Sequence, residues 1–335
     1  MRIAVVGLGF MGATHIRAIL GGAAQLAAVV SRDNRKLVGD LSGTSGNLDT
    51  GGGQFDFSAV KKYHALEEAL ADPEIDAVDL CLPTDQHESA AIAALRHGKH
   101  VLVEKPMALD GAACARMIEE SRRAGRVLMV AQVLRFFPSY LALSVARTQI
   151  GTIRGGSFRR SCAKPGWGDW LADAKRSGGG VFDLLIHDVD QALYLFGAPT
   201  AISATGHQNL ALGVDVIDAQ LYYNGFNIEI AGGWHPGEFP FSMEYKLVGD
   251  GGTVAFSSTG GTPMLYRAES ASQKLESPDG PAADGYRDEI SYFAACCSAG
   301  SKPEKCPPEE SAAAVRLTRA LSEARQRNGE KIAWT

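Results

Sequence analysis

The sequence of 335 residues lacks any tract rich in lysine or arginine, and its 33 basic and 38 acidic residues give a net charge of −5. Proteins that bind nucleic acids need a concentrated basic face, so we expect no nucleic-acid partner. The sequence also lacks an apolar run of roughly 18 residues, the length that a membrane-spanning helix requires. We therefore expect no membrane partner either.

Paired cysteines are absent as well, because the six cysteines are scattered and neither a CxxC nor an HExxH motif occurs. Zinc sites usually carry such spacings, so we expect no metal. The opening residues, MRIAVVGLGF, do not follow the pattern of a secretory signal peptide. Since a reducing compartment keeps scattered thiols free, we expect a cytoplasmic protein.

The overall composition is typical of a globular protein, with 45% hydrophobic and 21% charged residues. At roughly 150 residues per domain, the length suggests two domains. The first, residues 1–133, alternates short apolar runs with amphipathic stretches, which predicts an α/β fold with a doubly wound parallel sheet. We expect its strands at residues 2–6, 26–31, 59–63, 75–82, 100–104 and 127–132, and a Gly-rich loop over 39–53.

The second half, residues 134–335, predicts an α+β domain, which we assign to substrate binding and oligomerisation. A helix is expected over 178–197, antiparallel strands within 200–267, and closing helices near 285–299 and 308–327. The strands carry apolar residues on both alternating sets, with Val216, Ala219, Leu221 and Tyr223 on one and Ile217, Gln220 and Tyr222 on the other. Unless the closing helices cover it, one face leaves an apolar patch of the kind that marks interfaces. We expect a homodimer or homotetramer.

A GxGxxG motif follows the first predicted strand and opens the first predicted helix. In this setting the glycines allow a tight turn, a close approach of backbone to a pyrophosphate, and tight packing of helix on strand. We assign Gly7, Gly9, Phe10, Met11 and Gly12 to dinucleotide binding, the alternative being an ordinary strand–helix turn.

The second strand ends where a dinucleotide-binding protein selects its ribose. An acidic residue there favours NAD, whereas a cation accommodates the 2′-phosphate of NADP. This chain has Ser31 and Arg32, with Lys36 one turn later, and we predict NADP. Asp33 keeps NAD open as the alternative.

The carboxyl ends of the later parallel strands line the same crevice. The candidates for cofactor contacts are Leu82, Pro83, Thr84, His87, Glu104, Lys105, Pro106 and Gln132, with His87 alternatively capping the next helix. Arg135 lies just beyond the sixth strand and is a candidate substrate contact. His15 is interpreted as a packing residue.

Three motifs occur in order: GLGFMGATH near the start, VEKP in mid-chain and GGGxxxDxxxHxxD in the second half. Together the chain resembles the Gfo/Idh/MocA family of oxidoreductases along essentially its whole length. The resemblance implies a Rossmann domain followed by a domain with an open, mostly antiparallel sheet. It also implies that Lys105, Asp183 and His187 form the catalytic group, and that Trp170 leans on the nicotinamide.

The geometry of the helix predicted over 178–197 agrees with a catalytic site. At about 100° per residue, Asp183, His187 and Asp190 share one helix face, and burying such a stripe without purpose is costly. Histidine suits proton transfer near neutral pH, and either aspartate can orient it. Lys105 either stabilises the substrate oxygen or carries the proton itself. The alternative is a satisfied histidine in the core.

Indole rings suit stacking on sugar rings, so Trp167 is a further candidate substrate contact, as is Tyr286 at the start of a late helix. We expect an NAD(P)-dependent dehydrogenase or reductase of a sugar, polyol or related polyhydroxyl compound. The alternatives are a glycoside hydrolase of the same fold that uses its cofactor transiently, and a non-catalytic dinucleotide-binding sensor.

Overall fold

The computed structural model describes residues 1–46, 52–166 and 168–334, which form two compact units. The first unit combines Met1–Val133 with Gly285–Ala312, and the second combines Leu134–Asp284 with Ala313–Thr335. The sequence assigns everything after residue 133 to the second domain, and the structure differs in placing Gly285–Ala312 with the first. The physical reason is helix α9 (Gly285–Ala299), which packs on α1 (Phe10–Leu20).

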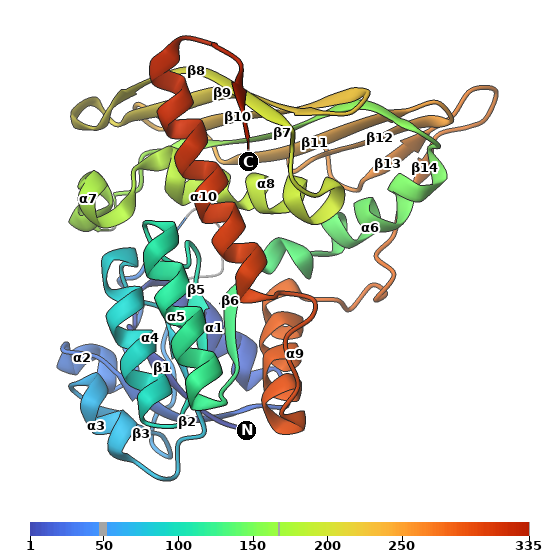
Figure 1. Ribbon diagram of the computed structural model, residues 1–335. Coiled ribbons are helices and arrows are strands. Elements are labelled where there is room, and N and C mark those ends of the chain that lie inside the picture. Colours follow the sequence, from blue (N-terminus) through green and yellow to red (C-terminus); the bar gives the residue numbers. More distant parts are fainter. Residues whose placement is uncertain (47–51, 167, 335) are drawn as a thin grey trace. The chain divides into compact units, whose positions relative to one another are not determined.

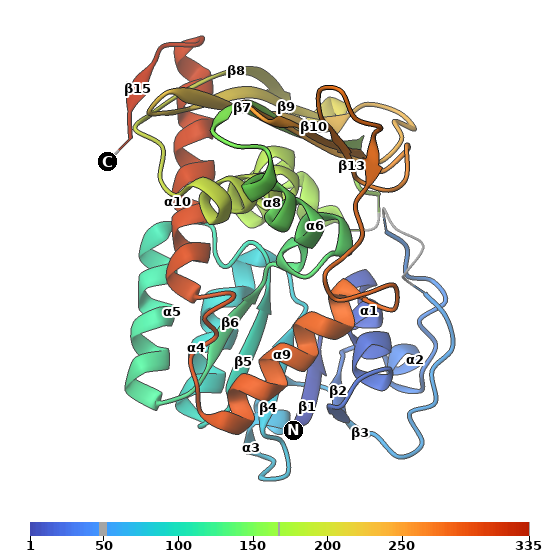
Figure 2. The same cartoon turned by 90° about the vertical axis from the view of Figure 1, so that its right-hand side faces the viewer.

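The first unit contains a six-stranded parallel sheet in the order β3-β2-β1-β4-β5-β6, as predicted. The strands are β1 (Arg2–Val6), β2 (Gln25–Val30), β3 (Lys61–Tyr63), β4 (Ala77–Leu80), β5 (His100–Glu104) and β6 (Leu128–Ala131). Helices α4 (His87–Arg96) and α5 (Gly111–Ala124) lie on one face, and α1 and α9 on the other (Figures 1 and 2). The short helices α2 (Asn34–Leu37) and α3 (Leu66–Ala71) complete the unit. Residues 47–51 of the expected loop lie outside the described residues.

The strand order reverses between β1 and β4, because β1 leads to β2 on one side and β4 to β5 on the other. In open α/β sheets such a switch point forms a crevice beyond the carboxyl ends of the strands, and ligands bind there. The glycine loop follows β1 and the segment Cys81–Thr84 follows β4. The topology therefore brings two of the predicted cofactor segments to the same edge.

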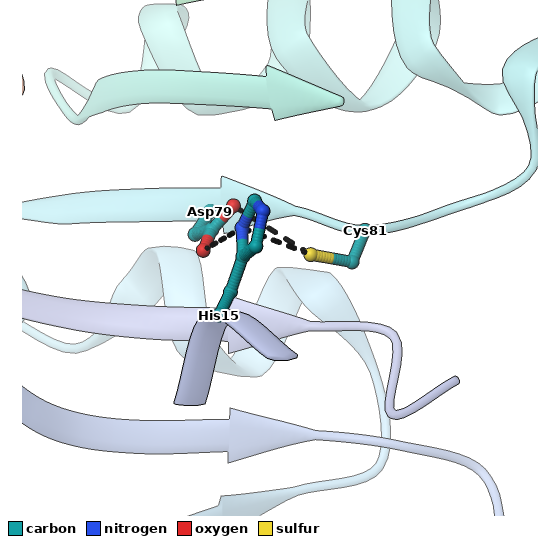
Figure 3. Close-up of side chains that lie close together, drawn as sticks. All are labelled: His15, Asp79 and Cys81. Carbon is teal, nitrogen blue, oxygen red and sulfur yellow. Dashed lines mark hydrogen bonds and ion pairs between the residues drawn. The ribbon is translucent and has the colours of Figure 1, made fainter. Parts of the chain in front are cut away.

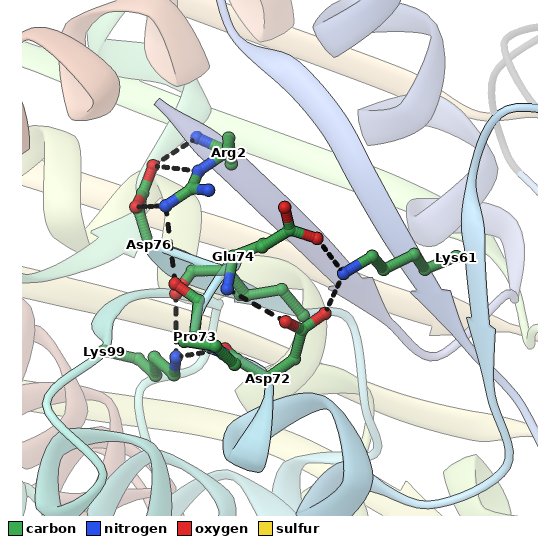
Figure 4. Close-up of polar contacts among 8 residues, drawn as sticks. Arg2, Lys61, Asp72, Pro73, Glu74, Asp76 and Lys99 are labelled. Atoms are coloured by element: carbon green, nitrogen blue, oxygen red, sulfur yellow. Dashed lines mark hydrogen bonds and ion pairs between the residues drawn. The ribbon is translucent and has the colours of Figure 1, made fainter.

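At the opposite end of this sheet, a polar network joins the segments that lead into the strands (Figure 4). Arg2 binds Asp76 through its backbone N–H and its guanidinium, both at 2.8 Å, and Lys61 binds Asp72 at 2.7 Å. Lys99 donates to the carbonyl oxygens of Asp72 and Ile75 at 2.6 and 2.8 Å. The hydrogen bond from Lys61 holds the pKa of Asp72 well below its usual range. This network lies at the amino-terminal ends of the strands, so its role is structural.

The second unit is built on a nine-stranded sheet in the order β14-β13-β12-β11-β7-β10-β9-β8-β15. All neighbouring strands are antiparallel except β7 and β10. Its strands are β7 (Ile153–Ala163), β8 (Ala201–Asn209), β9 (Val214–Tyr223), β10 (Phe226–His235), β11 (Ser242–Gly249), β12 (Gly252–Ser257), β13 (Met264–Tyr266), β14 (Gln273–Lys274) and β15 (Ile332–Ala333). This confirms the predicted mostly antiparallel sheet.

Helices cover one face of this sheet. Helices α6 (Pro138–Ala146) and α8 (Gly180–Phe196) lie there, and α8 packs on β7, β9 and β10 (Figures 1 and 2). The remaining helices are α7 (Ala174–Ser177) and α10 (Pro308–Ala324), and the unit boundary falls within α10. Throughout the described ranges, no helix is both long and apolar enough to cross a membrane.

The other face of the sheet is more polar than the sequence suggests. Along β9 the buried set is Asp215, Ile217, Ala219 and Leu221, so the predicted groupings of Val216 with Ala219 and Leu221, and of Ile217 with Gln220 and Tyr222, are wrong. Strict alternation instead puts Val216 with Asp218, Gln220 and Tyr222 on the second face. An open groove of 840 Å³ runs over β7 and β11–β13, lined by charged side chains such as Arg159, Glu229 and Lys246 together with Tyr266 and Val248. The expected apolar patch is therefore a mixed, charged surface.

Candidate functional site

The loop between β1 and α1 has the geometry that a pyrophosphate requires. Gly7 has a φ of +95°, and a Cβ there would clash with the carbonyl of Cys81. A Cβ on Gly12 would clash with the carbonyl of Gly7, so only glycine lets helix and strand approach this closely. A Cβ on Gly9 would meet nothing within 4 Å, so this position faces open space. Gly9 is also the N-cap of α1 and offers no side-chain cap to its amides. These features fit a bound dinucleotide, whose phosphates would be held by the N-terminal amides of α1.

The ribose-selecting segment follows β2. The Ser31 hydroxyl accepts a hydrogen bond from the Asp33 amide at 3.1 Å. Asp33 caps α2 by accepting from the Arg35 amide at 2.9 Å, and this bond lowers the pKa of Asp33. Arg32 is exposed and Lys36 is half-buried. The one acidic side chain in this segment is thus already engaged in capping a helix.

At the end of β4, Leu82 and Pro83 are half-buried and Thr84 is buried. His87 is also buried, and its two ring nitrogens lie 2.8 Å from the carbonyl oxygens of Pro106 and Leu82. Burial lowers the pKa of His87. Its ring joins the end of β4 to the segment after β5, so its nitrogens are already engaged and are not available to a cofactor.

The Glu104-Lys105-Pro106 segment ends β5. Glu104 points inward and is 6% exposed, whereas Lys105 is half-buried. The Glu104 carboxylate accepts a hydrogen bond from the Lys105 backbone N–H at 3.1 Å. After β6, Gln132 is 1% exposed, and its amide nitrogen lies 3.5 Å from the Ser311 hydroxyl. Neither Glu104 nor Gln132 therefore presents its side chain on an open surface of this unit.

The GGG segment leads into α8, which carries the predicted catalytic stripe. Gly178 and Gly179 have φ values of +81° and +88°, and this left-handed turn leads directly into the first turn of the helix. Asp183 and His187 lie one turn apart and are both half-buried. This is the accessibility that a proton-transferring pair requires.

Asp190 belongs to a different group. Its two carboxylate oxygens accept hydrogen bonds from Arg135 at 2.9 and 2.7 Å, and both side chains are almost fully buried. Of the two aspartates that the sequence offers to orient His187, Asp190 is thus committed elsewhere. Arg135 was also predicted to contact the substrate. Because its side chain is 2% exposed and bound to Asp190, it is not accessible to a substrate.

The predicted aromatic contacts lie in different places. Trp170 is half-buried and packs against Cys162, Leu171, Leu184 and Trp234 in the second unit. Tyr286 is the second residue of α9 in the first unit, with its ring 6.2 Å from that of His15. Trp167 lies outside the described residues.

Sequence reasoning missed a polar cluster inside the first unit. His15, interpreted as a packing residue, lies with Asp79 and Cys81 in a group whose side-chain nitrogen, oxygen and sulfur atoms fall within 4.8 Å of one another (Figure 3). The signal was present in the sequence, because Asp79 is a charge in the middle of the apolar run IDAVDLCL. A buried charge in a central strand needs a partner.

Comparison with known proteins identifies the family. A model of the oxidoreductase family with an NAD-binding Rossmann fold matches residues 1–132, and a model of the GFO/IDH/MocA C-terminal domain matches residues 141–255. A levoglucosan dehydrogenase solved in complex with NADH has a TM-score of 0.83 at 17% identity, covering 99% of this chain and 98% of that one. At this identity the likeness concerns the fold.

Two curated relatives are similar in sequence. Trans-1,2-dihydrobenzene-1,2-diol dehydrogenase of Mus musculus is 32% identical over 240 residues, which cover 70% of this chain and 66% of the relative. The scyllo-inositol 2-dehydrogenase (NADP(+)) of Bacillus subtilis is 32% identical over 180 residues, covering 50% and 54%. The matches span about half to two thirds of the relatives' lengths. With both domain models matched in order, the chain belongs to the Gfo/Idh/MocA family of oxidoreductases.

Proposed function

We propose that the protein is an NAD(P)-dependent oxidoreductase that interconverts the CH–OH and carbonyl forms of a sugar, polyol or related polyhydroxyl compound. The observation that carries the proposal is the glycine loop at the switch point of the sheet, with Gly9 facing open space and Lys105 at the end of β5. Relatives named as diol and inositol dehydrogenases support the substrate class.

The chain's own residues supply the proton chemistry. Oxidation removes a hydride from carbon and a proton from the hydroxyl oxygen, and a bound nicotinamide supplies the hydride acceptor. We propose that His187 or Lys105 takes the proton, and that a charged Lys105 also stabilises negative charge developing on the oxygen. Asp183, one turn before His187, fixes the orientation and tautomer of the imidazole. Reduction runs through the same groups in reverse.

A panel of sugars, polyols and their glycosides with both cofactors tests this proposal, read by nicotinamide absorbance and by product analysis. Net formation of reduced cofactor with an oxidised product is expected. Release of free sugar without net redox would identify a glycoside hydrolase instead. Tight cofactor binding with no product from any member of the panel would point to a sensor.

We further propose that NADP(H) is preferred over NAD(H). The capping role of Asp33 and the exposed guanidinium of Arg32 support this preference. A hydrogen bond between charged groups contributes roughly 1.5–3 kcal/mol, so Arg32→Ala should weaken NADP binding about tenfold or more and leave NAD binding unchanged. Titration of both cofactors checks this, with Arg154→Ala in the second unit as the control. Unchanged NADP affinity in Arg32→Ala, or tighter binding of NAD by the wild type, would contradict the preference.

We also propose a homodimer or homotetramer in the cytoplasm. The sheet face without helices in the described part of the second unit supports the oligomer, and the scattered spacing of the six cysteines supports the compartment. Because this face carries Arg159, Glu229 and Lys246, the association should weaken as salt rises. Sedimentation at micromolar concentration should give a species larger than 35.5 kDa at low salt. A 35.5 kDa species under all conditions would refute the proposal.

A further inference from the structure

His15 connects three elements in the interior of the first unit. It lies on α1 with no exposed surface, and its Nδ1 atom is 2.8 Å from the Asp79 carboxylate on β4. Its Nε2 atom is 3.0 Å from Oε1 of Glu104 on β5, an ion-pair contact whose direction does not meet that of a hydrogen bond. The other oxygen of Glu104 accepts the backbone N–H of Lys105 at 3.1 Å. A continuous polar chain therefore runs from Asp79 through His15 and Glu104 to the backbone of Lys105.

The charges within this chain are complementary. Burial, the largest single influence, lowers the pKa of His15, but Asp79 and Cys81 beside it together outweigh burial and raise this pKa well above its usual value. Burial alone raises the pKa of Glu104, but contact with His15 and the nearby charge of Lys105 outweigh burial and lower it. Both shifts favour the charged forms of His15 and Glu104, and their contact compensates buried charge.

The other titratable groups around His15 are held neutral. Burial raises the pKa of the Cys81 thiol, whose sulfur lies 3.6 Å from the His15 Nδ1 atom. On α9, burial raises the pKa of Glu289 well above its usual value, and neither oxygen of this carboxyl has a hydrogen-bond partner among the described residues. His15 and, more weakly, Lys305 act on Glu289 in the opposite direction. Among the described groups, His15 has the largest lowering effect on the pKa of Glu104, ahead of Lys105 and His87.

The distances favour direct polar contacts over a metal centre. Ligand atoms of a tetrahedral zinc ion, each about 2.0–2.1 Å from the metal, lie about 3.3 Å apart. The 2.8 Å between His15 Nδ1 and Asp79 is instead an ordinary hydrogen-bond length (Figure 3). A cation would have to displace that proton.

We propose that His15 is a positioning residue for Lys105: its bridge between Asp79 and Glu104 keeps Glu104 charged and fixed, and Glu104 in turn fixes the backbone of Lys105 at the end of β5. The inference rests on the proposed function in so far as Lys105 acts on the substrate. It predicts that contact with Glu104, rather than contact with Asp79, is what activity requires.

Two isosteric variants separate these contacts. The amide nitrogen of His15→Gln can replace Nε2 and keep the contact to Glu104, whereas that of His15→Asn can replace Nδ1 and keep only the contact to Asp79. We expect His15→Asn to lower kcat about 10- to 100-fold, the scale of a small misplacement of a reacting group, with unchanged cofactor affinity. His15→Gln should lose clearly less. His97→Asn, an exposed histidine at the end of α4, is the control.

The pH profile distinguishes positioning from a merely structural role. Without the imidazolium, the pKa of Glu104 rises, so Glu104 becomes protonated at higher pH. The acid limb of kcat/KM should therefore move to higher pH in His15→Asn, and by less in His15→Gln. In a Glu104→Gln background, His15→Asn should produce neither this movement nor a further loss of rate.

Hydrogen exchange can be measured without turnover, so it tests the positioning role of His15 independently of the proposed function. Hydrogen exchange of a peptide covering residues 100–106 should be faster in His15→Asn than in His15→Gln at equal melting temperature. If the wild type turns over no polyol but this difference persists, the proposed function fails and the positioning role stands. Equal exchange and equal pH profiles in both variants would overturn the inference, as would stoichiometric zinc in the purified wild type that is lost in His15→Asn.

Discussion

Replacing either His187 or Lys105 by alanine should lower the rate of hydride transfer by about 10²–10⁴-fold, the usual contribution of general acid–base catalysis. Cofactor affinity should stay nearly constant, because the phosphate loop on α1 is untouched. His187 is half-buried on α8, one turn after Asp183, and Lys105 is half-buried at the end of β5. Single-turnover measurements on each variant, with cofactor titration on the same preparations, check this result.

The double variant distinguishes joint from independent action. If the two groups handle the proton together, the double variant should lose much less than the product of the two single losses. Asp183→Asn should keep the fold and still lower the rate, because the imidazole is then free to adopt the wrong tautomer.

The contrary outcome is equally clear. If Asp183 and His187 are only a satisfied pair in the core, their variants will melt at lower temperature and keep normal turnover per folded molecule. Normal hydride transfer in His187→Ala would end the catalytic assignment.

Removing one partner of the Arg135–Asp190 pair should destabilise the second unit strongly. Both side chains are almost fully buried and joined by two hydrogen bonds. Asp190→Ala removes the carboxylate that accepts two hydrogen bonds from a buried guanidinium, and breaking a buried pair in this way typically costs about 3–5 kcal/mol. Denaturant unfolding should show this loss, and replacing both partners, in Arg135→Met with Asp190→Leu, should restore much of it.

The exposed pair of Arg154 and Asp250 provides the matched control. It has similar geometry, with N–O distances of 2.6 and 2.8 Å, but about half of each side chain is exposed to solvent. Asp250→Ala should leave stability almost unchanged, since solvent screens the pair. An Asp190→Ala variant that unfolds like the wild type but has lost hydride transfer would return Asp190 to the role of orienting His187.

Local patterns were sufficient for the architecture. The apolar runs of the first half predict the parallel sheet, and GxGxxG predicts the loop whose Gly7 and Gly12 leave no room for a side chain. These features depend on residues close together in the sequence, whose conformational preferences act locally. For the same reason the long α8 could be recognised from its flanking glycines.

Pairings between distant residues could not be predicted. Asp190 looked like part of the catalytic stripe because the helix period places it beside His187, but its partner Arg135 comes 55 residues earlier. His15 and Asp79 are 64 residues apart. The sequence shows that such charges are surrounded by apolar residues and so need partners, but only the tertiary fold decides which partner each one receives.

The return of the chain to the first unit has a consequence for dissecting the protein. Ile290 and Phe293 of α9 are buried, and α9 packs on the same helix α1 that carries the phosphate loop. A fragment ending at residue 133 would present the α9-facing side of α1 to water and would be prone to aggregate. The nucleotide-binding half is thus not a detachable module in the linear sequence, and an autonomous version would need residues 285–312 joined to residue 133 by a linker.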